Sequence, residues 1–262
     1  PKSVSGARVA VLYFENEGQR LRTRSYSGFA QALAESNIPY DVLVDGDGGF
    51  VSAELDSFDL QRYEVVVVPQ ALHLAPSQRD ALHAYVTKGG RALVADADGL
   101  DIPKRQFEVV RGEGKFILMP RVELPGFGKV DLGEAYSREY DEAYRRRIES
   151  LVVANSSEVL EVKGVDRTVT ATVQLQEDEG RIIVHLVNAD YDPESDRMRS
   201  KRDVILRVRR PDFYRFPREA HVYSPDLPEG ADDKPLALPP TVRGGFIEVI
   251  VPELEVYSVV VL

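Results

Sequence analysis

The sequence predicts an α/β domain built on a parallel sheet, followed by an all-β sandwich domain. Residues 65–68 are four consecutive valines between polar residues and Pro69. Such a run is too short for a helix and apolar on both faces, which is typical of a central parallel strand covered by helices. From residue 157 onward, apolar side chains recur at every second position and no long helical pattern returns. We therefore expect an α/β domain over residues 1–154 and a β-sandwich over residues 155–262.

Composition excludes several classes of protein. The chain has 262 residues, which is long enough for two domains with separate cores. Its formal net charge of −10 disfavours binding to nucleic acid. The absence of cysteine excludes disulfides, thiolate metal sites and a cysteine nucleophile. The sequence has no apolar run of membrane-spanning length and no basic-then-apolar leader, so we expect a soluble protein, cytoplasmic or secreted, that does not act at a membrane.

The first domain alternates strands and helices. The alternation of short apolar runs with helical periodicity favours a doubly wound parallel sheet. The helix after the valine strand has Pro76 in its first turn and is closed by Gly89 and Gly90. In order, we expect a strand at 8–14, a helix at 26–36, a strand at 40–44, a short irregular or helical piece at 51–61, a strand at 65–68, a helix at 75–88 and a strand at 90–96.

The end of this domain departs from the alternation. Residues 107–110 and 115–119 flank a turn that contains Gly112 and Gly114, so we expect a hairpin whose second arm joins the sheet as its last strand. Residues 134–154 are predicted to form the longest helix. Its apolar face carries Tyr136, Tyr140, Tyr144, Ile148 and Leu151.

The second domain shows the alternation of half-buried strands. Residues 169–175 place valine, alanine and leucine on one face and threonine and glutamine on the other. The count of seven or eight short strands is typical of a β-sandwich. Polar loops are expected at 189–201 and 225–243, and strands at 168–176, 181–188, 203–209, 219–223, 245–251 and 255–262.

Candidate binding residues follow the strands of the parallel sheet. Ligands of such sheets bind in the crevice beyond the carboxyl ends of the strands. No loop there is rich in glycine, serine or threonine before a helix, so we expect no phosphate-binding or nucleotide cofactor site. The crevice candidates are Glu15, Asn16, Arg24, Gln70, His73, Asp96 and Asp98.

Two acidic segments resemble cation sites without completing one. Residues 96–101 have the oxygen spacing of half a calcium loop but lack the closing glutamate, which favours a solvated turn. Residues 188–196 are also rich in oxygen ligands, but nearby Arg199 and Lys201 would pair with them. Each of the four histidines lacks a second ligand at metal-binding spacing. We therefore predict no metal and no cofactor.

Four segments within residues 8–99 resemble a known family. They are Leu12-Tyr13-Phe14-Glu15-Asn16-Glu17, Asn37-Ile38-Pro39-Tyr40-Asp41-Val42, Tyr63-Glu64-Val65-Val66-Val67-Val68-Pro69 and Leu82-His83-Ala84-Tyr85-Val86-Thr87-Lys88-Gly89-Gly90. In this order they resemble the trimerisation domain of bacterial β-galactosidases of the glycoside hydrolase type. The resemblance implies a flavodoxin-like, glutamine-amidotransferase-like fold that follows a catalytic TIM barrel, with the catalytic carboxylates in the barrel. The β-rich second half is similar in position to the C-terminal β domain of these enzymes, but longer.

The leading functional hypothesis is a non-catalytic, ancillary region of a multidomain glycoside hydrolase. The cysteine nucleophile of amidotransferases is missing, and residues 1–6 are linker-like, as if they continued from a longer chain. The expected partners are a preceding catalytic domain and other subunits of a homo-oligomer. The interface candidates are Tyr136 and Tyr140, if the tyrosine face of the 134–154 helix is exposed; otherwise that face is core.

Two alternatives come from other classes. In the first alternative, the β-sandwich is a carbohydrate-binding module. Such a module needs exposed aromatic rings, because sugars stack on them. The chain has no tryptophan, so its loop aromatics would have to serve: Tyr191, Phe213, Tyr214 and Phe216. In the second, the α/β domain is a small amidotransferase-like hydrolase that uses Asp96 or His73, although the sequence shows neither a base nor an oxyanion partner at fixed spacing.

Overall fold

A computed structural model describes residues 2–14, 23–46, 54–69, 74–95, 97–103, 106–214, 219–225 and 235–262. The chain is rich in strands, which form several sheets. Its contacts divide it into two units. The sandwich unit comprises residues 1–7, 34–39 and 158–262, and the α/β unit comprises residues 8–33 and 40–157. Residues 1–7 were expected in the first domain, but they group with the second half of the chain, so the expected domain boundary is corrected.

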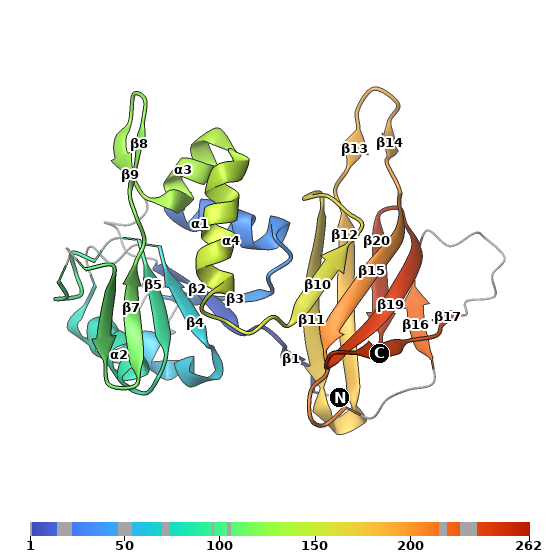
Figure 1. Cartoon of the computed structure of the whole chain (residues 1–262), viewed down its shortest axis with the longest axis horizontal. Coiled ribbons are helices and arrows are strands. Elements are labelled where there is room, and N and C mark those ends of the chain that lie inside the picture. Colours follow the sequence, from blue (N-terminus) through green and yellow to red (C-terminus); the bar gives the residue numbers. More distant parts are fainter. Residues whose placement is uncertain are drawn as a thin grey trace. The chain divides into compact units, whose positions relative to one another are not determined.

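The α/β unit is organised on a six-stranded sheet (Figure 1). The strands follow the order β3-β2-β4-β5-β7-β6, in which the first four neighbouring pairs are parallel and β6 runs antiparallel to β7. The elements of the sheet are β2 (Val9–Phe14), β3 (Tyr40–Asp45), β4 (Val65–Val68), β5 (Arg91–Val94), β6 (Glu108–Arg111) and β7 (Gly114–Leu118). The expected hairpin forms, but its first arm, β6, is the outermost strand and its second arm, β7, lies inside it. 

Helices and short turns complete this unit. The helices are α1 (Thr23–Glu35), α2 (Pro76–Thr87), α3 (Leu132–Glu139) and α4 (Glu142–Val153); the 3-10 turns are η2 (Leu55–Ser57) and η3 (Leu60–Arg62); a separate hairpin is formed by β8 (Val122–Leu124) and β9 (Gly128–Val130).

The four valines of β4 are buried on both faces of the sheet. Val66 and Val68 share a core with Leu82 and Val86 of α2. Val65 and Val67 point to the opposite face and are equally inaccessible to solvent. Burial on both sides explains why this strand is continuously apolar instead of alternating.

The expected helix over 134–154 is instead two helices, α3 and α4. Tyr140 ends α3 with a positive φ of 52°. The Asp141 side chain then accepts a hydrogen bond from the Ala143 amide at 2.8 Å and begins α4. A left-handed residue followed by an aspartate N-cap ends one helix and starts another, so the tyrosine stripe does not lie on a single helix.

Two sheets enclose one apolar core in the sandwich unit (Figure 1). The six-stranded sheet has the order β1-β11-β12-β20-β16-β17, and the four-stranded sheet has the order β10-β15-β19-β18. Val184 and Leu186 of the first sheet and Val204 and Leu206 of the second belong to the same buried cluster. Alternation along each strand places these residues inside and the polar residues outside.

The six-stranded sheet consists of β1 (Val4–Ser5), β11 (Val169–Gln176), β12 (Arg181–Asn188), β16 (Ala220–Tyr223), β17 (Leu236–Leu238) and β20 (Tyr257–Val261). The four-stranded sheet consists of β10 (Leu160–Lys163), β15 (Lys201–Arg209), β18 (Thr241–Arg243) and β19 (Phe246–Leu254); the turn η4 (Glu177–Glu179) joins β11 to β12, and β13 (Tyr191–Asp192) and β14 (Arg197–Met198) form a hairpin in the expected loop at 189–201.

Candidate functional site

Few of the predicted crevice residues are within the described part of the chain. Asp98 lies in the turn after β5, and Arg24 lies in the first turn of α1; both are exposed. Glu15, Asn16, Gln70, His73 and Asp96 lie outside the described residues. The predicted crevice site therefore stays a prediction for these five positions.

A pocket of about 340 Å³ opens at the carboxyl ends of β5 and β7. Asp98 and Arg121 contribute its charged groups, and Phe107 and Met119 contribute apolar surface. Arg24 is not among the lining residues, so the structure does not bring the two described candidates together in this pocket. The pocket lies where the sequence predicts ligand binding, at the end of adjacent parallel strands.

Sequence reasoning missed a buried hydrogen-bonded pair at the end of β4. Ser25 Oγ lies 2.9 Å from Asp131 Oδ1 and 3.1 Å from the Pro69 carbonyl oxygen, so both acceptors are within reach of its single hydroxyl proton. Asp131 also accepts from the Glu134 amide at 2.9 Å and so begins α3. Burial raises the pKa of the Asp131 carboxyl group. The pattern Asp131-x-x-Glu134 at the start of a helix was the available signal.

A second buried carboxylate lies at the end of β3. Asp45 accepts hydrogen bonds from the Leu55 amide, at 2.5 Å, and from the Gln78 side chain. Burial raises the pKa of Asp45 above its ordinary value, while these two bonds act in the opposite direction. Gln78 Oε1 also accepts from the Ala75 amide at 2.7 Å, at the beginning of α2. These contacts connect a strand end to a helix start, which is a structural role.

Ion pairs engage several carboxylates of the two acidic segments and of the turn before β11. Lys201 Nζ contacts Asp190 at 2.6 Å and Asp166 at 2.9 Å, and Arg199 contacts Asp190 at 3.2 Å. Asp101 pairs with Arg79 at 3.2 Å. Within the described ranges, His, Asp and Glu side chains form no group of three or more that would hold a metal ion.

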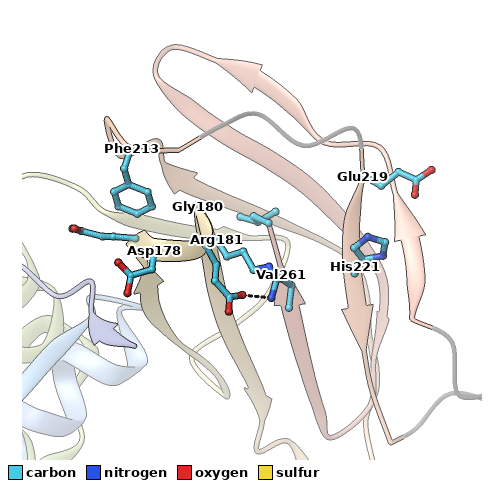
Figure 2. Close-up of a pocket in the computed structure, with 10 residues that line it drawn as sticks. Asp178, Gly180, Arg181, Phe213, Glu219, His221 and Val261 are labelled. Atoms are coloured by element: carbon cyan, nitrogen blue, oxygen red, sulfur yellow. Dashed lines mark ion pairs between the residues drawn. The ribbon is translucent and has the colours of Figure 1, made fainter. Parts of the chain in front are cut away.

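A larger pocket, of about 540 Å³, lies in the sandwich unit (Figure 2). Its lining comes from the turn η4, the first residue of β12, the loop after β15, the start of β16 and the end of β20. Arg181 forms an ion pair with Glu179 at its edge. Sequence analysis named one of its residues, Phe213, as a loop aromatic. The full lining is Glu177, Asp178, Glu179, Gly180, Arg181, Phe213, Glu219, His221, Val261 and Leu262.

The two interface candidates differ sharply in exposure. Tyr136 is fully buried in α3, so it is a core residue and the expectation of an interface role for it is corrected. Tyr140 keeps 53% of its surface exposed, and its ring meets that of Tyr136 edge to face at 6.0 Å. Their exposures differ because Tyr136 lies within α3, whereas Tyr140 ends that helix with a left-handed backbone conformation.

Comparison with solved structures identifies similar folds. No family model matches the sequence, and no curated protein matches it. α-L-Fucosidase isoenzyme 2 from Paenibacillus thiaminolyticus aligns with 99% of this chain at a TM-score of 0.66 and 16% identity. A rhamnosidase from Novosphingobium sp. PP1Y aligns with 98% of it at a TM-score of 0.54 and 14% identity. The chain therefore shares its fold with parts of these two glycoside hydrolase structures.

The chain corresponds to only a part of each of these proteins. It spans 49% of the fucosidase chain and 22% of the rhamnosidase chain. A GH42 β-galactosidase from G. stearothermophilus aligns with 98% of this chain and 40% of its own, with a TM-score of 0.48 and 12% identity. Among the described residues, no helix is long and apolar enough to cross a membrane.

Proposed function

We propose that this chain is a non-catalytic, ancillary C-terminal region of a multidomain glycoside hydrolase or a relative, serving assembly and supporting a catalytic barrel. The observation that carries the proposal is the fucosidase alignment, in which 99% of this chain matches 49% of a larger enzyme chain. An alignment that uses all of one chain and half of the other favours a region of a larger enzyme. The parent protein would supply the catalytic carboxylates.

The finer fold assignment is part of this proposal. We assign the α/β unit to the flavodoxin-like, glutamine-amidotransferase-like class and to a trimerisation role. The order β3-β2-β4-β5-β7, with parallel pairing throughout, supports the class, since it is the strand order of flavodoxin-like sheets. The trimerisation role follows from the resemblance to β-galactosidases.

The chemistry of the crevice pocket favours a non-catalytic role. Its described lining offers Asp98 and Arg121 but no serine, histidine or cysteine. A nucleophilic mechanism requires a nucleophile and a base within hydrogen-bond reach of each other. The Ser25 hydroxyl, which does not line this pocket, is buried and contacts Asp131 and a carbonyl oxygen, without a histidine. The alternative hydrolase hypothesis rests on Asp96 and His73, and an Asp96→Asn variant that kept full activity would remove it.

Two exposed aromatic residues of the α/β unit fit a role in assembly. Phe127, in the turn between β8 and β9, is 54% exposed and lies under the Arg138 guanidinium at 3.9 Å from the ring centre. Tyr140, two residues after Arg138 in the sequence, is also exposed. Tyrosine, phenylalanine and arginine are enriched in protein interfaces. We propose that Phe127, Arg138 and Tyr140 contact the catalytic domain or another subunit.

Mass measurement tests the assembly role. The full gene product is compared with its Tyr140→Gly variant by size-exclusion chromatography with light scattering. We expect an oligomer for the natural protein and a shift to smaller species for the variant. Glycine suits the left-handed conformation at this position, so the melting temperature should stay nearly unchanged. The matched control is Tyr223→Ser, an exposed tyrosine of the sandwich unit, which should leave the mass unchanged.

Activity measurement tests the ancillary role. This chain alone should not release nitrophenol from a panel of aryl glycosides, whereas the full gene product should. Hydrolysis by the isolated chain at the rate of the full product would overturn the proposal. A full product that is monomeric would overturn the assembly role separately.

A further inference from the structure

The pocket of the sandwich unit has an apolar floor set by strand register. Val261 of β20 is paired with Ile183 of β12 on one side and with His221 of β16 on the other. Their chain neighbours Ile182, Val222 and Val260 are buried in the core, so the paired residues lie on the outer face of the sheet. Val261 and His221 line the pocket there.

One aromatic side chain forms a wall of this pocket, and it is held in place. Phe213 is half-buried and packs against the core of the sandwich. The adjacent Tyr214 is only 2% exposed, and its amide donates to the Pro211 carbonyl oxygen at 3.1 Å. Figure 2 shows the Phe213 ring beside the turn that carries Asp178. A fixed ring needs little reordering when a ligand binds.

The rim of the pocket is rich in hydrogen-bond acceptors. Glu177, Asp178 and Glu179 follow one another in η4, and Glu219 precedes β16. Arg181 pairs with Glu179, and within the described ranges no ion pair engages the other three carboxylates. Four carboxylates against one guanidinium make this pocket negative, which repels anionic ligands.

We propose that this pocket binds a neutral saccharide. Sugar hydroxyl groups donate hydrogen bonds, which the rim carboxylates accept, and the Arg181 guanidinium and His221 ring add polar groups. The C–H face of a pyranose ring would lie against Phe213 and the Val261 floor. The volume of about 540 Å³ falls within the roughly 300–1,000 Å³ of small-molecule sites. The proposal goes beyond the assembly role, since it needs neither a barrel nor a second subunit.

Of the four loop aromatics named from the sequence, Phe216 lies outside the described residues, and Phe213 alone among the other three lines the pocket. Tyr214 is buried, and Tyr191 is in the β13–β14 hairpin, where its hydroxyl donates to Asp196 at 2.5 Å. Tyr191 does not line the pocket, although it is 51% exposed. Substitution of the half-buried Phe213 and of the exposed Tyr191 should therefore affect binding differently, and a matched pair of variants tests this.

Binding is tested with the chain described above. A glycan array that carries neutral and acidic oligosaccharides screens the natural chain, and isothermal titration follows with lactose, maltose, cellobiose, xylobiose and digalacturonate. We expect at least one neutral probe to bind and digalacturonate not to bind. Phe213→Ala should weaken that binding at least tenfold, and Asp178→Asn several-fold. Tyr191→Ala should leave the affinity within twofold of the natural value.

Each result decides the question. Absence of any neutral glycan binding, a Phe213→Ala variant that binds like the natural chain, or loss of binding only in Tyr191→Ala would each overturn the proposal. Thermal melting of each variant shows whether it is folded. The exposed Asp178 provides a variant that should keep the fold even if Phe213→Ala does not. A failure of saccharide binding would not change the outcome of the mass measurement, which tests the assembly role, or of the activity measurement, which tests the ancillary role.

Discussion

The Asp131 carboxylate connects α1 and α3 by accepting hydrogen bonds from Ser25 and the Glu134 amide. Ser25 in turn contacts the Pro69 carbonyl oxygen at the end of β4. Replacing it with alanine leaves the Glu134 amide without its side-chain acceptor at the start of α3. We expect Asp131→Ala to lower the free energy of unfolding of the α/β unit by about 2 kcal/mol, as for loss of a partly buried N-cap. Asp131→Asn keeps an acceptor oxygen and should cost less. Urea denaturation followed by circular dichroism measures both.

The same residue predicts a pH dependence. Burial raises its folded-state pKa above the ordinary value of 3.8, although hydrogen bonds from Glu134 and Ser25 act to lower it. The folded chain then binds this proton more tightly than the unfolded chain, so the group's contribution to stability is present at low pH and is lost as pH rises through the folded-state pKa. The stability of Asp131→Asn relative to the natural chain should therefore rise with pH across this window. A constant difference would contradict this assignment.

At the level of single residues, the sequence predicted candidate binding residues from their position directly after the strands of the parallel sheet. This criterion selected Asp98 and not Asp45 or Asp131. Burial raises the pKa values of Asp45 and Asp131, and burial depends on contacts with distant residues. Ser25 and Asp131 are more than a hundred positions apart. The Phe213 ring was named from composition alone, but its pocket depends on strand registers that the sequence does not display.

Helices α1 and α3 approach each other through a pair of glycines. A Cβ atom added at Gly28 would lie 1.8 Å from the Gly133 carbonyl oxygen, and one added at Gly133 would lie 2.4 Å from the Ser25 carbonyl oxygen. Glycine inside a helix costs about 1 kcal/mol relative to alanine, so its presence in α1 reflects packing. The close approach also brings Ser25 within reach of Asp131.

Gly28→Ala tests this close approach. The gain in helix propensity is smaller than the cost of moving two backbones apart, and we expect a net loss of about 2 kcal/mol. For a unit of this size, that corresponds to a fall in melting temperature of roughly 4–8 °C. Ser27→Ala, an exposed neighbour on the same helix, is the control and should change the melting temperature little. Equal melting temperatures for both variants would show that the helices can separate freely.

Elements with long apolar patterns were predictable from the sequence, and elements without them were not. The strand at 65–68 and the alternating strands at 169–176 and 203–209 are present near their expected bounds. The short strands β8, β9, β17 and β18 each have three residues, too few to show a period. The break at Tyr140 was missed because an apolar stripe at helical spacing continues across it, whereas the backbone there turns left-handed.

At the scale of the whole molecule, the chain begins and ends in the same unit. Val4 and Ser5 pair with Leu175 and Gln174 of β11, and the Gly6 amide donates to the Val173 carbonyl oxygen at 3.0 Å. The α/β unit therefore lies in the sequence between β1 and the later strands of the sandwich unit, interrupted by residues 34–39, which are grouped with the sandwich unit. The expected boundary at 154 lies close to the change of unit at 157, but the change at residue 7 was not predicted because a two-residue strand has no pattern.

Removal of residues 1–6 tests this arrangement. The β11 edge would lose its partner, and we expect the sandwich unit to lose about 1–3 kcal/mol of stability, corresponding to a few backbone hydrogen bonds. Hydrogen exchange measured by mass spectrometry should show faster exchange in β11 and unchanged exchange in β2 to β5. Removal of residues 1 and 2 alone retains β1 and serves as the control. Uniform loss of protection in both units would contradict the assignment of β1 to the sandwich.

The pairing of β1 with β11 also constrains the order of events during synthesis. β1 leaves the ribosome long before its partner β11, and β20, which lies between β12 and β16, is made after both of these neighbours. The α/β unit is fully translated by residue 157 and is free to fold while the later strands of the sandwich unit are still being added. β1 therefore has no β11 to pair with until residues 169–176 are made, and the six-stranded sheet is complete only after β20 is released.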